Sequence, residues 1–256
     1  MASLSHAGKV RDTNQDACGE YVDARGRVCI VADGMGGHAV GDMASQMVVQ
    51  RLNTLPPPTS LGTFVGQVRE HLRDVNERLH QEALTRSERV IGSTVVALLA
   101  FEHRCVCLWA GDSRLYLFRD GRLSQLTRDH TQVEELLARG LLQPQDAHNH
   151  PAANAITRAV GGEGELNLDS ELVTVREGDI LMLCSDGLHN EVSSDEIGTI
   201  LLRGRCQQAS EELVNLALSR GARDNVSVIV VRADEEISTT KTILNPLFSE
   251  TQDRSQ

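Results

Sequence analysis

Five aspartates of this sequence lie where apolar runs begin or end. Asp33 follows the run RVCIVA and Asp186 follows the run ILMLCS, and in both cases a glycine comes directly after the aspartate. The other three are Asp16, Asp112 and Asp224. Short apolar runs bounded by turn residues are typical of buried strands, so each carboxylate is predicted to lie at a strand end.

Carboxylates that share one pocket need a counter-charge. Aspartate and glycine are also common turn residues, and for any single position that interpretation is the simpler one. Asp23, Asp179 and the pair Asp120-Gly121 are predicted to be such turns, the last of them in a hairpin. If the other strand ends converge, however, several carboxylates at low dielectric repel one another unless they are protonated or bind a cation. A set of oxygen ligands favours Mg²⁺ or Mn²⁺ over zinc.

The residues around these aspartates point to phosphoryl chemistry. Gly34 is expected to clear space for an ion, because a residue without a side chain would let the ion reach its carbonyl oxygen. Hard divalent ions lower the pKa of a bound water and turn it into a nucleophile. Arg11, five residues before Asp16, could bind two phosphate oxygens through its planar guanidinium group. A lone arginine is more often a surface ion-pair partner, so Arg11 is informative only beside the aspartates.

The strands that must position these side chains follow one another with little helix between Ser93 and Thr127. That order favours antiparallel sheets. Helices are predicted where apolar residues recur every three to four positions. They cover about residues 42–55, 64–83, 132–139, 195–202 and 208–219. Helices segregated from antiparallel strands predict a layered α+β domain.

Composition excludes several classes of partner. The chain has 256 residues and a net charge of −11, which argues against nucleic acid and anionic membrane surfaces. The opening residues contain no signal-peptide core, and no apolar stretch is long enough to span a membrane. None of the six cysteines forms a C-x-x-C pair. They are expected to be reduced core residues of a cytoplasmic protein.

Eight short motifs occur in a recognisable order between Arg11 and Val231. They are RDTNQD, VADGMGGH, GST, AGDSRLYL, LTRDHT, ITRAVG, CSDGL and DNVSVIVV. In this order they resemble the motifs of bacterial metal-dependent protein phosphatases of the type 2C (PPM) family. The resemblance implies a four-layer α-β-β-α sandwich with two central antiparallel β-sheets flanked by helices. It also implies hydrolysis of phosphoserine and phosphothreonine in proteins by a water that bridges two Mn²⁺ or Mg²⁺ ions.

The resemblance assigns the central metal ligands residue by residue. Asp33, Asp186 and Asp224 would hold the two ions and form the catalytic centre, with Asp33 bridging both. The Gly34 carbonyl would bind the second ion, and Asp16 would act there directly or through water.

Three further roles are implied in the same way. Asp112 matches a residue that helps to bind a third, weaker ion in bacterial members. Arg11 matches the phosphate-binding arginine of some members, and Asn225 would support the metal ligands. The implied partners are phosphorylated protein substrates and a cognate serine/threonine kinase, and the chain is expected to act as a monomer.

The sequence departs from the family pattern at three positions. Gln15 replaces a glutamate that many members have before the first aspartate. Met35 replaces a histidine proposed to protonate the leaving group, and His38 cannot simply inherit that role. The sequence therefore assigns no general acid, and metal-bound water is one substitute that the chemistry allows. Asn190 replaces an acidic residue of the third metal site. These departures leave open a non-catalytic phosphoprotein-binding scaffold. A hydrolase of small phosphorylated metabolites also stays open, because the sequence does not name the substrate.

Nothing in the sequence divides the chain, so residues 1–233 are expected to form a single catalytic domain. Within it, about residues 140–164 are expected to form an exposed flap, and residues 234–256 a flexible C-terminal tail. Ser113 and Ser185 are expected to support the neighbouring aspartates through hydrogen bonds, and the pair Asp129-His130 to order the start of a helix.

Overall fold

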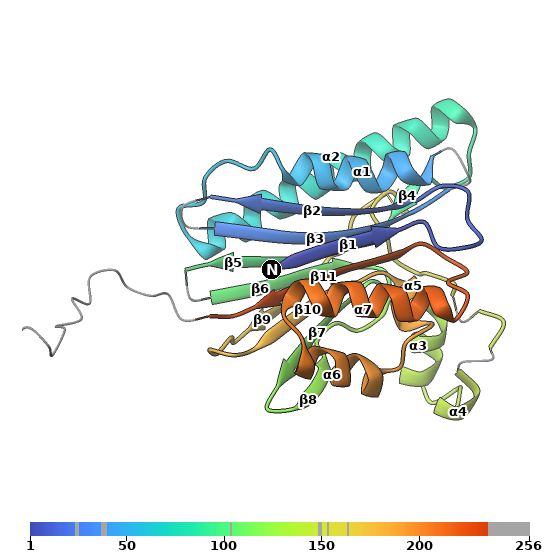
Figure 1. The fold of residues 1–256 in the computed structure, drawn as a ribbon. Coiled ribbons are helices and arrows are strands. Elements are labelled where there is room, and N and C mark those ends of the chain that lie inside the picture. The colour runs from blue at the N-terminus through green and yellow to red at the C-terminus, as the bar shows by residue number, and fades with distance from the viewer. Residues whose placement is uncertain are drawn as a thin grey trace, which may run out of the picture.

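Two antiparallel sheets lie face to face between helices in the computed structural model (Figure 1). The structure describes residues 1–23, 26–36, 40–102, 104–147, 150–152, 154–162 and 164–234. Helices α1 (Gly41–Leu52) and α2 (Leu61–Arg86) cover one sheet. Helices α6 (Ser194–Arg203) and α7 (Cys206–Ser219) cover the other. The predicted α-β-β-α sandwich is confirmed.

The six-stranded sheet packs under α1 and α2. Its main strands run in the order β2, β3, β5, β6, β9, and the short β4 pairs with β3. The strands are β2 (Asp16–Val22), β3 (Gly26–Met35), β4 (Gly92–Ser93), β5 (Val95–Phe101), β6 (Arg104–Ala110) and β9 (Asp169–Val173). Along β3, Val28, Ile30 and Ala32 join the core beneath the helices, whereas Cys29 and Val31 join the core between the sheets. Because strand side chains alternate in direction, β3 contributes to both cores.

The five-stranded sheet has the order β1, β11, β10, β7, β8. Its strands are β1 (Ala2–His6), β7 (Arg114–Arg119), β8 (Arg122–Gln125), β10 (Ile180–Cys184) and β11 (Val226–Arg232). The predicted hairpin at Asp120-Gly121 is confirmed, because Arg119 pairs with Arg122 across these two residues. Asp120 and Gly121 have φ angles of 51° and 76°, as a tight two-residue hairpin loop requires.

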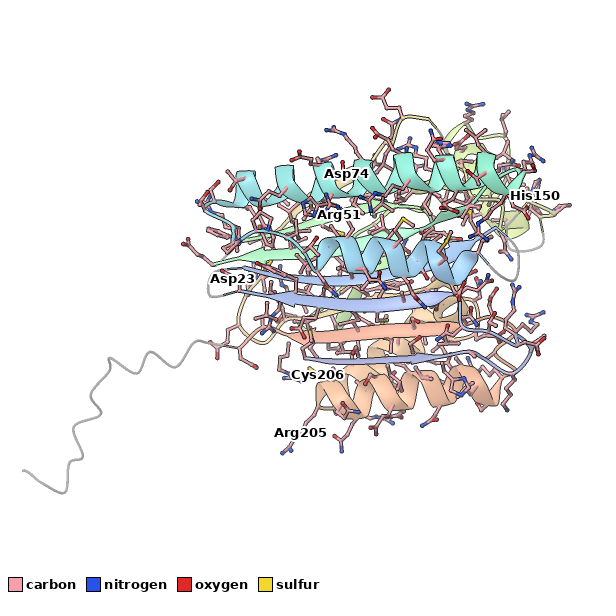
Figure 2. The ribbon with its side chains drawn as sticks, turned by 90° about the horizontal axis from the view of Figure 1, so that it is seen from above. Asp23, Arg51, Asp74, His150, Arg205 and Cys206 are labelled. Carbon is pink, nitrogen blue, oxygen red and sulfur yellow. The ribbon has the colours of Figure 1, made fainter. Side chains whose placement is uncertain are left out.

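The helices form where the apolar spacing predicts them. Ser60 caps α2, where its side chain accepts a hydrogen bond from the Thr63 backbone at 3.1 Å. The stripe along α2 is buried in full: Phe64, Val68, Leu72, Val75, Leu79 and Ala83. Figure 2 labels Arg51 of α1 and Asp74 of α2, whose ion pair joins the two helices on their outer side.

Several short elements were not anticipated from the sequence. Strand β1 has little apolar periodicity, and it is held as an edge strand by antiparallel pairing with β11. Strand β9 is mostly exposed and pairs with β6 at the other sheet's edge. Helix α5 (Asp186–His189) is a single turn, and α4 (Pro144–Ala147) is equally short. Such elements depend on tertiary contacts more than on local sequence preference.

The segment predicted as a flap is exposed at its start, where α4 lies. Its end is packed: Ala159 and Val160 are buried, and Val160 pairs with Ser93. The tail predicted over 234–256 lies outside the described residues from position 235 onward.

The six cysteines are free, and Cys29, Cys105, Cys107 and Cys184 are buried. This agrees with the expectation of reduced cysteines for all six, and with a core location for these four. In the part of the chain that the structure describes, no helix has the length and apolar character needed to cross a membrane.

Candidate active site

The predicted aspartates meet at one end of the sandwich. Asp16 begins β2 and Asp33 lies near the end of β3, and the register pairs the two residues directly. Directly opposed residues in an antiparallel sheet place their side chains on the same face. From the second sheet, Asp186 follows β10 and Asp224 precedes β11. The antiparallel pairing of β10 with β11 puts both residues at the same sheet end, near β4 and α5 in Figure 1.

Asp112 completes this group, which we call the acidic cluster: Asp16, Asp33, Asp112, Asp186 and Asp224. It lies in the turn between β6 and β7, next to Arg114, which pairs with Cys184 at the end of β10. The Asp33 carboxyl is influenced electrostatically by each of the other four carboxylates. The five side chains therefore lie at one end of the sandwich, within electrostatic reach of Asp33, and that they form one metal site stays a prediction.

Burial and mutual repulsion disfavour the charged form of these groups. Burial, together with the neighbouring charges, raises the pKa of Asp16 and of Asp112 to about 7 and that of Asp186 to about 6. The pKa of Asp33 is raised well above its usual range, first by burial and then by the charges of the other four aspartates. Asp16 and Asp112 are only 7% and 6% exposed, whereas Asp33 and Asp186 keep part of their surface open to solvent. A ligand can therefore reach the cluster from that open side.

Three oxygens of the cluster are buried without a hydrogen-bond partner in the described protein. They are Asp16 Oδ1, Asp112 Oδ1 and Asp186 Oδ1. Buried polar atoms in folded proteins are nearly always paired, so three orphans within one cluster indicate a missing partner. Carboxylate oxygens that need a positive partner are suitable ligands for a hard divalent cation. The residues present thus fit the metal ions that the resemblance implies.

The cluster does not enclose an ion through side chains alone. Among the described residues, no three His, Cys, Asp or Glu side chains are arranged as a ready metal cage. Mg²⁺ in proteins commonly keeps several waters and takes only one or two carboxylates. A centre completed by water and by a backbone carbonyl is therefore the form that this geometry can accept.

The two glycines of the Asp-Gly motifs let other backbone segments approach closely. A Cβ atom on Gly34 would lie 1.8 Å from the Gly41 carbonyl oxygen and 2.9 Å from that of Gln15. A Cβ atom on Gly187 would lie 2.0 Å from the Asn225 carbonyl oxygen. The expectation that Gly34 clears space for an ion is thus incomplete, because the space beside it is taken by backbone. That the Gly34 carbonyl binds metal stays a prediction.

Arg11 and Asn225 connect the N-terminal loop to the cluster. The Arg11 guanidinium donates to Asp224 Oδ2 at 2.7 Å, and this interaction raises the Arg11 pKa further. Asn225 accepts a hydrogen bond from the Gln15 backbone at 2.8 Å and donates to the carbonyls of Ala7 and Thr13. Arg11 is thus at the edge of the cluster, with its side chain 45% exposed, where an incoming anion can meet it.

Hydrogen bonds from serine, threonine and asparagine orient the carboxylates. Ser185 donates to Asp16 Oδ2 at 2.7 Å. Ser113 bonds to Thr94, whose hydroxyl accepts from the Asp33 backbone N–H. The two serines thus do form supporting hydrogen bonds, but to Asp16 and Asp33 and not to the aspartates next to them in the sequence. Asn190 donates to Asp186 Oδ2 at 3.1 Å.

The other two departures from the family pattern also have a place in the fold. Gln15 packs against Gly41, where a Cβ atom would lie 2.2 Å from the Gln15 amide nitrogen. Met35 ends β3 and pairs with Gly92 of β4. His38 lies outside the described residues.

Two histidines beside the cluster have roles that the sequence did not reveal. His189 is one helical turn after Asp186, a spacing that places both on one side of α5, and this was the available signal. Burial lowers its pKa to about 3, so it is neutral.

The expectation for Asp129-His130 was wrong, because Thr131 caps α3 (Gln132–Ala138). Asp129 instead pairs with Arg114, and His130 packs on Trp109 with ring centroids 6.1 Å apart.

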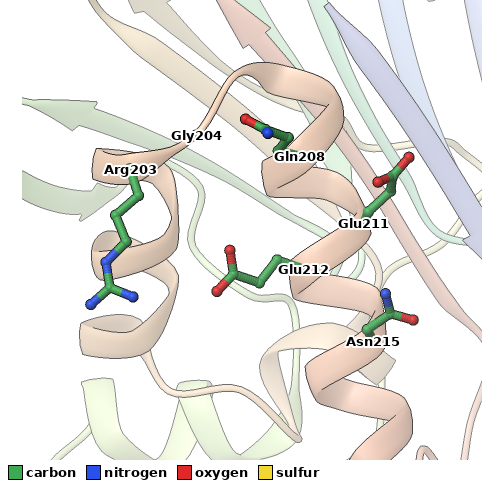
Figure 3. Close-up of a pocket in the computed structure, with 6 residues that line it drawn as sticks. All are labelled: Arg203, Gly204, Gln208, Glu211, Glu212 and Asn215. Atoms are coloured by element: carbon green, nitrogen blue, oxygen red, sulfur yellow. The ribbon is translucent and has the colours of Figure 1, made fainter.

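A groove of about 520 Å³ lies elsewhere, between the end of α6 and α7 (Figure 3). Arg203 and Glu212 extend into it from opposite helices. Its lining residues are Arg203, Gly204, Gln208, Glu211, Glu212 and Asn215. None of them belongs to the acidic cluster, so this groove is separate from the place where the aspartates meet.

Known proteins with similar sequences and structures are phosphatases. The family profile described as Protein phosphatase 2C matches residues 5–223. Protein phosphatase PhpP of Streptococcus pneumoniae is 38% identical over 242 residues, covering 92% of this chain and 98% of its own length. PppA, a key regulatory component of T6SS in Pseudomonas aeruginosa, superposes with a TM-score of 0.82 at 44% identity, over 91% of this chain and 96% of PppA.

A solved relative holds metal. The catalytic domain of the serine/threonine protein phosphatase PstP, in complex with two manganese ions, superposes with a TM-score of 0.80 at 34% identity. The match covers 91% of this chain and 97% of that one. The family profile covers Asp16, Asp33, Asp112 and Asp186 of the cluster and ends one residue before Asp224. The alignment with PhpP spans 92% of this chain. The chain belongs to the protein phosphatase 2C family, and it is a serine/threonine protein phosphatase.

Proposed function

We propose that this phosphatase hydrolyses phosphoserine and phosphothreonine in proteins with the help of two Mn²⁺ or Mg²⁺ ions held by the acidic cluster. Asp33, Asp186 and Asp224 would hold the pair, with Asp33 shared between the ions and the Gly34 carbonyl as a further ligand. When bound, such ions lower the pKa of a water and make it a nucleophile near neutral pH. Asp16 would join them directly or through water.

The observation that carries this proposal is the group of three buried carboxylate oxygens without partners, together with the raised pKa values around them. A cation that binds among buried carboxylates relieves their mutual repulsion and so stabilises the folded protein. The two manganese ions of the PstP complex support the same interpretation for a relative.

The protein's own groups would bind and orient the phosphoryl group. The Arg11 guanidinium is partly exposed at the cluster edge, where it can exchange Asp224 for two phosphate oxygens. Asn225 would hold the Asp224 segment in place through its three hydrogen bonds to the N-terminal loop. Met35 carries no proton that could be donated, so it would not protonate the leaving oxygen.

Asp112 would help to bind a third, weaker ion. Its carboxylate is buried beside Asp186 and lacks a partner for Oδ1, which supports a role in cation binding. Asn190 donates to Asp186 and is uncharged, so this third ion would be held with fewer negative charges than an acidic residue there would supply.

At the level of the cell, the enzyme would oppose a serine/threonine kinase by removing the phosphoryl groups that the kinase adds. Residues 1–233 would form the catalytic domain, acting as a monomer, and 234–256 a tail. Light scattering of the purified chain would test the monomer.

Mn²⁺-dependent release of phosphate from p-nitrophenyl phosphate and from phosphothreonine peptides tests the mechanism. Turnover should stop in excess EDTA and return when Mn²⁺ is added back, and Asp33→Asn should remove it while leaving a folded protein. Full activity of folded Asp33→Asn, or of the EDTA-treated enzyme, would contradict the proposal. Mn²⁺ binding without any hydrolysis would favour a phosphoprotein-binding scaffold instead.

A further inference from the structure

The peptide that carries Asp112 is held from two sides by imidazole rings. His130 exchanges two hydrogen bonds with Gly111: its backbone N–H donates to the Gly111 carbonyl at 2.9 Å, and its Nδ1 accepts from the Gly111 N–H at 3.2 Å. His189 contacts the next carbonyl along the chain, with Nε2 at 3.1 Å from the Asp112 oxygen. Both polar groups of Gly111 and the carbonyl of Asp112 are therefore bound by histidines.

The His130 ring is fixed in one orientation and one tautomer. Because Nδ1 accepts from Gly111, the ring proton is on Nε2, which donates to Asp169 Oδ2 at 3.1 Å. The ring also stacks on Trp109 with an interplanar angle of 12°, and the Trp109 indole donates to the Arg128 carbonyl at 2.9 Å. Rigid partners of this kind restrict the rotation of the ring.

His189 approaches from the other sheet. It ends α5, the single turn that begins with Asp186, and its ring reaches the backbone of Asp112. Because a carbonyl oxygen only accepts, Nε2 must carry the proton and donate to it. Asp186 and the Asp112 peptide are thereby fixed to each other through one rigid turn.

We infer that His130 and His189 are positioning residues that keep the Asp112 carboxylate directed into the acidic cluster. A turn held only by its chain neighbours could rotate Asp112 toward solvent, where its carboxylate would be hydrated instead of being buried with an unpaired Oδ1. Bonds to both adjoining peptide groups oppose that rotation. The inference rests on the proposed role of Asp112 in binding a cation.

His130 also connects Asp112 to residues 157–158, near the end of the 140–164 segment. The Thr157 backbone donates to the His130 carbonyl at 2.8 Å, and Arg158 pairs with Asp169, which accepts from the His130 ring. A displacement of residues 157–158 would therefore act on His130 first and on Asp112 second.

Two pairs of variants separate the hydrogen bond from simple packing. His189→Met fills the interior without a donor, whereas His189→Gln can place an amide N–H near the position of Nε2. His130→Leu removes the acceptor for Gly111, and His130→Asn can restore it near the position of Nδ1. His71→Leu is the matched control, because the His71 ring also bonds a backbone carbonyl, that of Arg51 at 3.0 Å, but between α1 and α2.

Two measurements on the purified full chain test the inference. The first is amide hydrogen exchange of residues 109–113 in the metal-free protein, which should become faster in His189→Met and His130→Leu only. The second is calorimetric titration with Mn²⁺, in which loss of a residue that orients a ligand typically weakens affinity by about 10- to 100-fold. We expect the affinity for the most weakly bound Mn²⁺ to fall by this factor in the Met and Leu variants and in Asp112→Asn. The Gln, Asn and His71→Leu variants should stay close to the unmodified protein.

The inference is overturned if folded His189→Met and His130→Leu exchange and bind Mn²⁺ like the unmodified protein, or if Asp112→Asn binds Mn²⁺ unchanged. If a Met or Leu variant fails to melt cooperatively, the Gln and Asn variants decide, because weakened binding in both would exclude the proposed hydrogen bonds. An unmodified protein without Mn²⁺-dependent turnover would contradict the proposed function itself, which is a separate outcome.

Discussion

Strand β10 has an aspartate beside each end, and the two have opposite surroundings. Asp179 precedes the strand and Asp186 follows it, and each has a glycine next to it. Asp179 accepts from Arg119 at 2.6 and 2.8 Å and from the Arg176 backbone, and these bonds lower its pKa. Asp186 faces other carboxylates, its pKa is raised to about 6, and Oδ1 has no partner.

This difference separates a structural aspartate from a functional one. At the Asp179 end, the fold supplies the positive charge and the hydrogen bonds that a buried carboxylate needs. At the Asp186 end, the fold gathers carboxylates and leaves the positive charge to a ligand, at a cost in stability of the metal-free protein. Asp179 was predicted to be only a turn residue, and the structure adds an ion pair in which Asp179 is buried and Arg119 is partly exposed.

Exchanging each aspartate for asparagine should give opposite results, and these are the largest effects we expect. Asp186→Asn should lower kcat for p-nitrophenyl phosphate by about 10³-fold. It should also raise the metal-free unfolding free energy at pH 8, on the order of 1–2 kcal/mol, because one repelling charge is removed. Asp179→Asn should lower the unfolding free energy by about 1–3 kcal/mol and leave kcat unchanged. Phosphate-release assays and urea melts measure both. If both variants changed kcat and the unfolding free energy in the same way, the distinction between a structural and a functional aspartate would be wrong.

The pH dependence of stability should also differ between the ends. Asp16, Asp112 and Asp186 have folded pKa values of about 7, 7 and 6, above their ordinary value of 3.8. The folded state then holds more protons than the unfolded state between about pH 4 and 7. The metal-free unfolding free energy should therefore fall as pH rises through that range.

Added Mn²⁺ should reverse this loss. A ligand present at a concentration of 100 times its Kd stabilises the folded state by about 2.7 kcal/mol. Because the carboxylates are deprotonated at pH 8, Mn²⁺ should raise Tm more at pH 8 than at pH 5. The Asp179 contribution has the opposite sign, because its lowered pKa gives stability that is lost only as pH falls below its ordinary range. Thermal melts over pH 4–8, with EDTA and with Mn²⁺, test both statements. A metal-free Tm that rises steadily from pH 5 to 8 would contradict the first.

The neighbouring glycines provide a smaller test. In Gly187→Ala the new methyl group would meet the Asn225 carbonyl at 2.0 Å and displace the segment that carries Asp224. We expect destabilisation of about 1–3 kcal/mol and a clear loss of kcat. Gly178→Ala has open space around it and only an unfavourable φ of +84°, so it should cost about 1–2 kcal/mol and leave kcat unchanged. Equal kcat values for the two variants would show that close packing at Gly187 is not required.

The smallest stability effect is expected for the arginine at the open end. The Arg11–Asp224 pair is exposed, so Arg11→Ala should change the unfolding free energy by about 0–1 kcal/mol. Its consequence should be a raised KM for phosphothreonine peptides, since Arg11 would no longer bind phosphate oxygens. Arg119→Ala, which removes the partner of Asp179, should do the reverse and reduce stability without changing KM. A normal KM in Arg11→Ala would argue against the phosphate-binding role.

Much of this architecture could be predicted from local patterns. The α2 stripe, the Asp120-Gly121 hairpin and the strands that carry Asp33, Asp186 and Asp224 follow from periodicity and turn chemistry. Strands β1 and β9 could not be predicted, because their side chains are too mixed and only pairing at a sheet edge makes them strands. The role of His189 was also missed, because its spacing from Asp186 becomes informative only once α5 is known to be a helical turn.

By itself, the sequence determined which residues stand at strand ends, since the apolar runs set where strands begin and stop. Their types and order were enough to indicate metal-dependent phosphatase chemistry through a family resemblance. Only the tertiary structure showed what each carboxylate meets, because Asp179 and Asp186 each stand beside a glycine at an end of one strand and differ in what lies across from them. It also showed that Gly34 and Gly187 are glycines because the backbones of Gly41 and Asn225 press against them. Repulsion, pairing and close approach depend on distances between segments far apart in the chain, and those distances exist only after folding.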